Sequence, residues 1–244
     1  VLGFSQTPNS NALDIMKNLQ HEMDTLAQSF PDDMEFKIAY DSTTFVRASI
    51  QSIVETLFLT FFLVVLVVFV FLQDPKSTLI PTITIPVSLI ATFIVIYALG
   101  FNLNILTLFA MILAIGLVVD DAIIVVERAQ YLMQTENLNA VDASIKAMQQ
   151  ISGAIIATTF VLLSIFIPVG LMAGITGKIY QQFAVTIATA VVFSAVNALT
   201  LSPSLCAIFL QTAQAQKSDK KSWLEKLFTP FNKGLDYAKE QYLK

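Results

Sequence analysis

The sequence predicts an all-α membrane protein in which a helical bundle of five transmembrane helices follows a small α+β segment. Hydrophobic residues make up 55% of the 244 residues and charged residues 13%, whereas soluble domains carry about a quarter charged residues. Five segments are apolar over the roughly 20 residues that a helix needs to cross the hydrocarbon layer. Charged residues are concentrated outside these segments, as expected of a chain that crosses a membrane repeatedly.

Residues 1–46 are expected to form a β-α-β unit. Asn9, Ser10 and Asn11 offer an N-cap, and apolar residues then recur at helical spacing, at Leu13, Met16, Leu19, Met23, Leu26 and Phe30. Residues 1–4 resemble the end of a strand, and residues 35–40 alternate like a strand with one buried face. A unit of about 46 residues is small for an independent hydrophobic core, so we expect the edge of a larger domain.

The membrane region is predicted to cover residues 47–212, with spans at residues 51–72, 77–98, 103–126, 151–171 and 180–210. No charged residue occurs between Ser77 and Val119 or between Ile179 and Gln216. Prolines inside the spans, at Pro81, Pro86 and Pro168, are compatible with spanning helices, where neighbouring groups satisfy the freed backbone. The buried core of a large soluble protein is the alternative, which five such runs in succession disfavour.

Lysine and arginine residues predict the orientation of the spans. They are more frequent after the first, third and fifth spans than on the opposite side. This bias places the C-terminal tail in the cytoplasm and residues 1–46 outside it. Residues 1–4 contain neither an initiator Met nor the pattern of a signal peptide. Because export of residues 1–46 would need an earlier spanning helix, we expect the chain to be an internal fragment.

Two further helices are predicted on the cytoplasmic side. Asn139 followed by Asp142 resembles a capping box and predicts a short connecting helix to about Gln149. Residues 213–244 interleave apolar residues with lysines, which predicts an amphipathic helix lying at the membrane surface. A solvated linker helix remains the alternative for this tail, because Pro230 interrupts its periodicity.

Two adjacent aspartates, Asp120 and Asp121, lie inside the third span. Charged side chains within a span cost several kcal/mol and are functional by default. Neighbouring helical residues project about 100° apart, so both aspartates can face one bundle interior. Gly116 lies one turn before Asp120 on the same face, where a small residue lets another helix approach closely. Two adjacent carboxylates in a dry site cannot both ionise cheaply, so we expect the pair to bind and release protons as a coupled unit.

Other polar positions in the spans give weaker signals. Glu127 and Arg128, at the cytoplasmic end of the third span, are interpreted as interfacial anchors. Hydroxyl and amide residues of the fifth span, Ser194 and Asn197 among them, are interpreted as packing contacts between helices. All lysines and arginines lie outside the deep parts of the spans. We therefore expect a cation from a helix outside this chain to face the aspartates, although a pair fixed permanently by such a cation remains a purely structural alternative.

Charge and composition exclude other kinds of chemistry. The net charge of −4 offers no basic surface for a nucleic acid. Cys206 is the only cysteine, so the chain has no internal disulfide. No residues have the spacing of metal ligands, and we expect neither a metal nor another cofactor.

The stretch from Gly116 to Glu127 resembles the fourth-helix motif of the resistance–nodulation–division efflux transporters. The resemblance continues in residues 71–73 with 78–82, in residues 177–183 and in residues 201–207, and covers essentially the whole chain. The tandem Asp120 and Asp121 are similar to the hydrophobe/amphiphile efflux branch, whereas the heavy-metal branch carries a single aspartate followed by alanine.

The resemblance implies a subunit of the bacterial inner membrane. Its spans would be helices two to six of twelve, after the end of a periplasmic porter subdomain and before a cytoplasmic-surface helix. It implies a homotrimeric proton antiporter, not an enzyme, that exports hydrophobic or amphiphilic compounds through a periplasmic adaptor protein and an outer-membrane channel. Asp120 and Asp121 would be its proton relay, with the proton as coupling ion and a lysine of the tenth helix as the facing cation.

Two other functions are weighed against proton-coupled efflux. One is lipid or protein translocation by a related member of the same superfamily, which would use the same aspartates for proton coupling. The other is an intramembrane aspartyl protease, which needs two carboxylates from different helices sharing a water. The only deep acids here are neighbours on one helix, which disfavours the protease.

Overall fold

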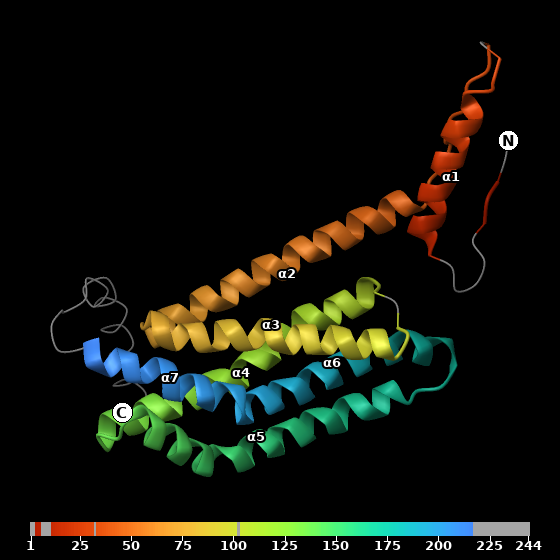
Figure 1. Cartoon of the computed structure of the whole chain (residues 1–244). Helices are drawn as coiled ribbons and strands as arrows, with labels where there is room; N and C mark the ends of the chain where they lie inside the picture. Colours follow the sequence, from red (N-terminus) through yellow and green to blue (C-terminus); the bar gives the residue numbers. More distant parts are fainter. Residues whose placement is uncertain (1–2, 6–10, 32, 102, 217–244) are drawn as a thin grey trace, which may run out of the picture. The chain divides into compact units, whose positions relative to one another are not determined.

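The computed structural model of the chain describes residues 3–5, 11–31, 33–101 and 103–216, and its regular structure there is helical (Figure 1). The helices are α1 Ala12–Ala27, α2 Thr43–Leu72, α3 Pro75–Ala98, α4 Ile105–Thr135, α5 Ala140–Gly170, α6 Gly174–Leu199 and α7 Leu201–Gln216. The chain divides into two compact units, Val1–Glu55 and Thr56–Lys244. Most of the predicted amphipathic tail, residues 217–244, lies outside the described residues.

The first unit contains the predicted helix but not the predicted strands. Asn11 caps α1, because its side-chain oxygen accepts a hydrogen bond of 3.0 Å from the backbone amide of Leu13. Residues 3–5 and 34–41, which cover most of the expected strands, form no ladder. An extended segment becomes a strand only when another backbone pairs with it, and the described residues of this unit provide no such backbone. Helix α1 also buries none of its side chains, so no sheet packs against it among the described residues.

Within the described part of the chain, five helices are long and apolar enough to cross a membrane, which confirms the predicted number of spans: Thr43–Leu72, Pro75–Ala98, Ile105–Thr135, Ala140–Gly170 and Thr176–Leu199. Side-chain caps determine where three of them begin. Asp74 caps α3, Asn104 forms a capping box at the start of α4, and Asn139 caps α5.

The sequence predicted that the helix capped by Asn139 ends near Gln149, and this prediction is wrong. The helix continues as α5 through Gly170, so the connecting helix and the fourth span are one element. A break between them would leave backbone carbonyls without partners close to the hydrocarbon layer, where each unsatisfied group costs several kcal/mol.

The predicted span at residues 180–210 is two helices. Helix α6 ends at Leu199 and α7 begins at Leu201, and the chain bends between them while continuing toward the same end of the bundle (Figure 1). Pro203 explains the break, because it has no amide hydrogen to donate to the Leu199 carbonyl and its ring crowds that carbonyl.

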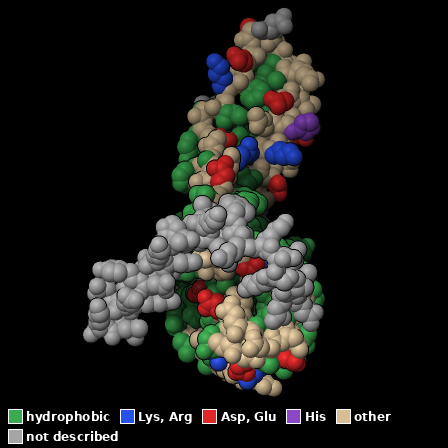
Figure 2. All heavy atoms as spheres, turned by 90° about the vertical axis from the view of Figure 1, so that its left-hand side faces the viewer, with side chains coloured by type: hydrophobic (Ala, Val, Ile, Leu, Met, Phe, Trp, Pro, Cys, Tyr) green, Lys and Arg blue, Asp and Glu red, His purple; other side chains and the backbone are tan. Residues whose placement is uncertain are grey.

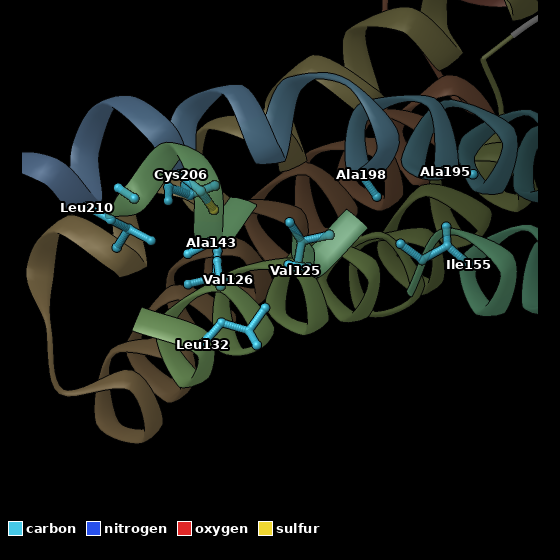
Figure 3. Close-up of a cluster of buried hydrophobic side chains, with 13 residues drawn as sticks. Val125, Val126, Leu132, Ala143, Ile155, Ala195, Ala198, Cys206 and Leu210 are labelled. Carbon is cyan, nitrogen blue, oxygen red and sulfur yellow. The ribbon is translucent and has the colours of Figure 1, made fainter. Parts of the chain in front are cut away.

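A cluster of buried hydrophobic side chains joins helices α3 to α7 (Figure 3). Its members are Ile80, Val125, Val126, Ala129, Leu132, Ala140, Ala143, Ala147, Ile155, Ala195, Ala198, Cys206 and Leu210. Six of the thirteen are alanines, and small side chains let helices approach one another closely. The cluster includes the C-terminal half of α4, and so it fixes the helix that carries the two aspartates.

Candidate functional site

The two aspartates lie well inside α4 and point in different directions. Asp121 is half-buried, whereas Asp120 is exposed, and both are flanked by the buried residues Val119 and Ala122. Because neighbouring residues project about 100° apart on a helix, the edge of the bundle falls between the two side chains. Among the described helices the two carboxyl groups therefore do not face the same neighbours.

Asp121 is linked to α6 by a serine. The Ser194 hydroxyl donates to Asp121 Oδ2 at 2.6 Å and lies 3.2 Å from the backbone carbonyl oxygen of Val118. Ser194 is only 2% exposed. The carboxyl group of Asp121 is therefore held at the α4–α6 contact.

Asp120 lies about 100° around the helix from Asp121, in a stripe that we call the open face of α4: Phe109, Leu113, Gly116, Asp120 and Ile124. All five are exposed in this structure. A Cβ atom added at Gly116 would meet nothing within 4 Å. Gly116 and Asp120 thus share one face, as the sequence predicted, and the helices described here leave that face uncovered.

A second polar contact lies one turn beyond Ser194. Asn197 Nδ2 donates to Ser88 Oγ at 2.8 Å, which links α6 to α3. Ser88 belongs to a row of buried hydroxyl residues on α3 that includes Thr84 and Thr92. Hydrogen bonds of this kind satisfy polar groups that could not be left unpaired in the hydrocarbon layer.

Basic side chains near α4 are engaged away from the aspartates. Arg128 Nε donates to Gln150 Oε1 at 2.7 Å, and its guanidinium carbon lies 5.0 Å from the centre of the Tyr131 ring. Lys146 forms a salt bridge with Glu136 where α4 joins α5, at the end of the bundle where Figure 2 shows charged side chains. Among the described residues, no lysine or arginine lies within salt-bridge distance of either aspartate.

The arrangement is suited to binding and releasing protons. The hydrogen-bond partner of Asp121 is the neutral hydroxyl of Ser194, and a neutral partner does not hold a carboxyl group in its ionised form as a cation would. Within the described residues, no group of three or more His, Cys, Asp or Glu side chains could hold a metal ion.

Sequence reasoning did not connect Ser194 with the aspartates and treated it as a packing residue. The signal is weak: Ser194 and Asn197 are three residues apart, and so lie on adjoining parts of one face of an apolar helix. Serine and asparagine at this spacing also occur in ordinary helix contacts, so only the structure shows that Ser194 faces Asp121.

The whole chain, residues 1–244, matches the model of the AcrB/AcrD/AcrF family. Among curated proteins, it is 42% identical over 241 residues to the Multidrug export protein AcrF of Escherichia coli K12, a match that covers 99% of this chain and 23% of that protein. It is 39% identical over 231 residues to the Solvent-resistant pump membrane transporter SrpB of Pseudomonas putida, covering 93% of this chain and 22% of the relative.

A third relative, the Toluene efflux pump membrane transporter TtgE, also from Pseudomonas putida, is 40% identical over 235 residues. That match covers 96% of this chain and 22% of the relative. The chain thus spans less than a quarter of the length of these relatives.

Proposed function

Because the chain belongs to the AcrB/AcrD/AcrF family of resistance–nodulation–division efflux transporters, we propose that it acts within a drug/proton antiporter. This antiporter exports hydrophobic or amphiphilic compounds across the Gram-negative cell envelope. The observation that carries the proposal is the aspartate pair inside a spanning helix, with Asp121 bound to Ser194 at 2.6 Å. The relatives' names support the substrate class, since they mention multidrug, solvent and toluene transport, and they do not favour lipid or protein translocation.

In this mechanism Asp120 and Asp121 take up a proton from one side of the membrane and release it on the other. One proton that moves across a potential of about 100 mV releases about 2.3 kcal/mol. That free energy sustains roughly a 50-fold concentration ratio of an exported compound. A single titratable pair is therefore sufficient to drive useful export.

An ionised Asp120 needs a partner, because an unpaired charge in the hydrocarbon layer costs several kcal/mol. The open face of α4 has room for one, since Gly116 meets no atom within 4 Å on that face. We therefore place a lysine or arginine from an element outside the described residues against Asp120. A lysine of the tenth helix, which the family resemblance implies, would meet this requirement.

Proton coupling is tested with the full-length transporter that contains these residues, purified and reconstituted in lipid vesicles. An imposed pH gradient should drive transport of a fluorescent amphiphilic dye, and adding the dye should in turn speed the decay of the gradient. A protonophore should abolish both effects. Dye transport that persists at full rate without a proton gradient would contradict the proposed coupling.

We also propose an inner-membrane orientation with residues 1–46 in the periplasm and residues 211–244 in the cytoplasm. The protein would be a homotrimer that engages a periplasmic adaptor protein and an outer-membrane channel. The distribution of lysine and arginine supports this orientation, and the family resemblance supports the assembly.

The orientation predicts which positions an impermeant thiol reagent reaches in intact cells with a permeabilised outer membrane. A cysteine at the exposed Lys178 should react, and a cysteine at the exposed Gln134 should react only after the inner membrane is lysed. Cys206 is buried and should give little background labelling. The reverse labelling pattern would invert the topology and contradict export toward the periplasm.

A further inference from the structure

Ser194 has two possible acceptors on α4 and one proton to donate. Its hydroxyl oxygen lies 2.6 Å from Asp121 Oδ2 and 3.2 Å from the carbonyl oxygen of Val118. A serine hydroxyl carries a single hydrogen, while its oxygen can also accept. Because Ser194 is 2% exposed, water does not compete for the group. The hydroxyl can therefore make a strong bond to only one of the two acceptors at a time.

The protonation state of Asp121 decides which acceptor the hydroxyl binds. When Asp121 is ionised, its charged oxygen is the stronger acceptor, and the separation of 2.6 Å lies within the range of about 2.5–2.7 Å typical of bonds from a hydroxyl to a carboxylate. When Asp121 binds a proton, its own O–H can donate to Ser194 Oγ, and the serine hydrogen can then turn to the Val118 carbonyl. Ser194 keeps its own proton throughout, and only the carboxyl group gains one.

Resting on the proposed function, we propose that Ser194 is a positioning residue that keeps Asp121 hydrogen-bonded in both of its protonation states by turning its hydroxyl between Asp121 and Val118. A lysine, an arginine or a backbone amide can only donate, and so would stabilise the ionised carboxylate alone. A hydroxyl with a second acceptor can stabilise both states. A carboxyl group that must bind and release a proton in every cycle requires such a partner.

No charged group on the described helices makes a hydrogen bond to Asp121 like that of Ser194. Asp120, next to Asp121 on α4, is the charged group that acts on it electrostatically. The remaining charged side chains on the described parts of the helices packed against α4 belong to residues near helix ends: Lys76 on α3, Asp142 and Lys146 on α5 and Lys178 on α6. The tyrosines Tyr97 and Tyr180 and the buried Cys206 complete the titratable groups on these helices. None of them is hydrogen-bonded to Asp121, so Ser194 carries the link between the carboxyl group and α6.

The test combines infrared spectroscopy with transport in the full-length protein. The carboxyl stretch of protonated Asp121 is assigned as the band that disappears in the Asp121→Asn variant. In the Ser194→Ala variant this band should move to higher wavenumber, because the carboxyl group loses its hydrogen-bond partner. Proton-driven export should fall about tenfold or more, as expected for the loss of a hydrogen bond to a charged group. The Ser194→Cys variant, with a weak S–H donor of similar size, should lie between the two.

Ser144→Ala is the matched control. Ser144 is 3% exposed, and its hydroxyl donates at 2.7 Å to the Ala140 carbonyl of its own helix. This variant should leave both the band and export unchanged. An unshifted band in folded Ser194→Ala protein, or an equal loss of export in Ser144→Ala, would overturn the role of Ser194. Full export by Asp121→Asn would instead refute the proposed proton relay, whereas the band shift in Ser194→Ala would still report the contact between the two side chains.

Discussion

The Asp120→Asn and Asp121→Asn variants are each expected to lose proton-driven export almost completely. Asparagine has nearly the same shape as aspartate but cannot bind a proton in this pH range. A reduction of about 100-fold or more is expected when a group that transfers protons is removed. Folding should survive, since Asp120 is exposed in this bundle and Ser194 can still donate to the amide oxygen at position 121. Dye accumulation in cells that lack other pumps, at matched expression levels, measures the effect.

The Glu127→Gln variant is the control for these two changes. Glu127 lies two turns beyond Asp120 on the same helix and is also exposed, but the sequence predicts that it lies just beyond the third span. Removal of this charge should leave export close to normal. If Asp120→Asn retains normal export, Asp120 is not part of the relay, and its charge has only a structural role.

Hydropathy was sufficient to predict five helices that are long and apolar enough to span a membrane. The spans could be predicted because an apolar run of sufficient length has few alternatives to a spanning helix. The positions at which these helices break could not be predicted from the sequence. Pro81 and Pro168 lie inside α3 and α5, whereas Pro203 follows the break between α6 and α7. Whether a proline ends a helix depends on which neighbours satisfy the carbonyl it frees, and that is a property of the packed bundle.

The directions of the two carboxyl groups also depend on packing. The helical angle of about 100° fixes their separation around α4, but not where the contact with α6 ends. The structure places that boundary between Asp121, which contacts Ser194, and Asp120, which shares the open face with Gly116. The strands expected within residues 1–46 do not form among the described residues for a related reason, because a strand requires a partner that its own sequence does not specify.

The Gly116→Leu variant is expected to impair export without weakening the bundle described here. A Cβ atom at this position meets nothing within 4 Å, and leucine has a higher helix propensity than glycine, which is about 0.8–1 kcal/mol less favourable in a helix than alanine. The thermal stability of the bundle should therefore be unchanged or higher. In the transporter, the leucine side chain would keep the element that carries the cation farther from α4, and so farther from Asp120.

The size of this effect follows from the distance between the two charges. At an effective dielectric constant of about 20, moving a cation from about 4 to about 7 Å weakens the pair from about 4 to about 2.4 kcal/mol. The difference corresponds to roughly a 20-fold loss of export. Gly153→Leu is the matched control, because Gly153 lies inside α5 and also meets nothing within 4 Å, but it has no acid one turn away. Normal export by Gly116→Leu would show that no element approaches the open face there, and the proposed cation would then have to reach Asp120 by another route.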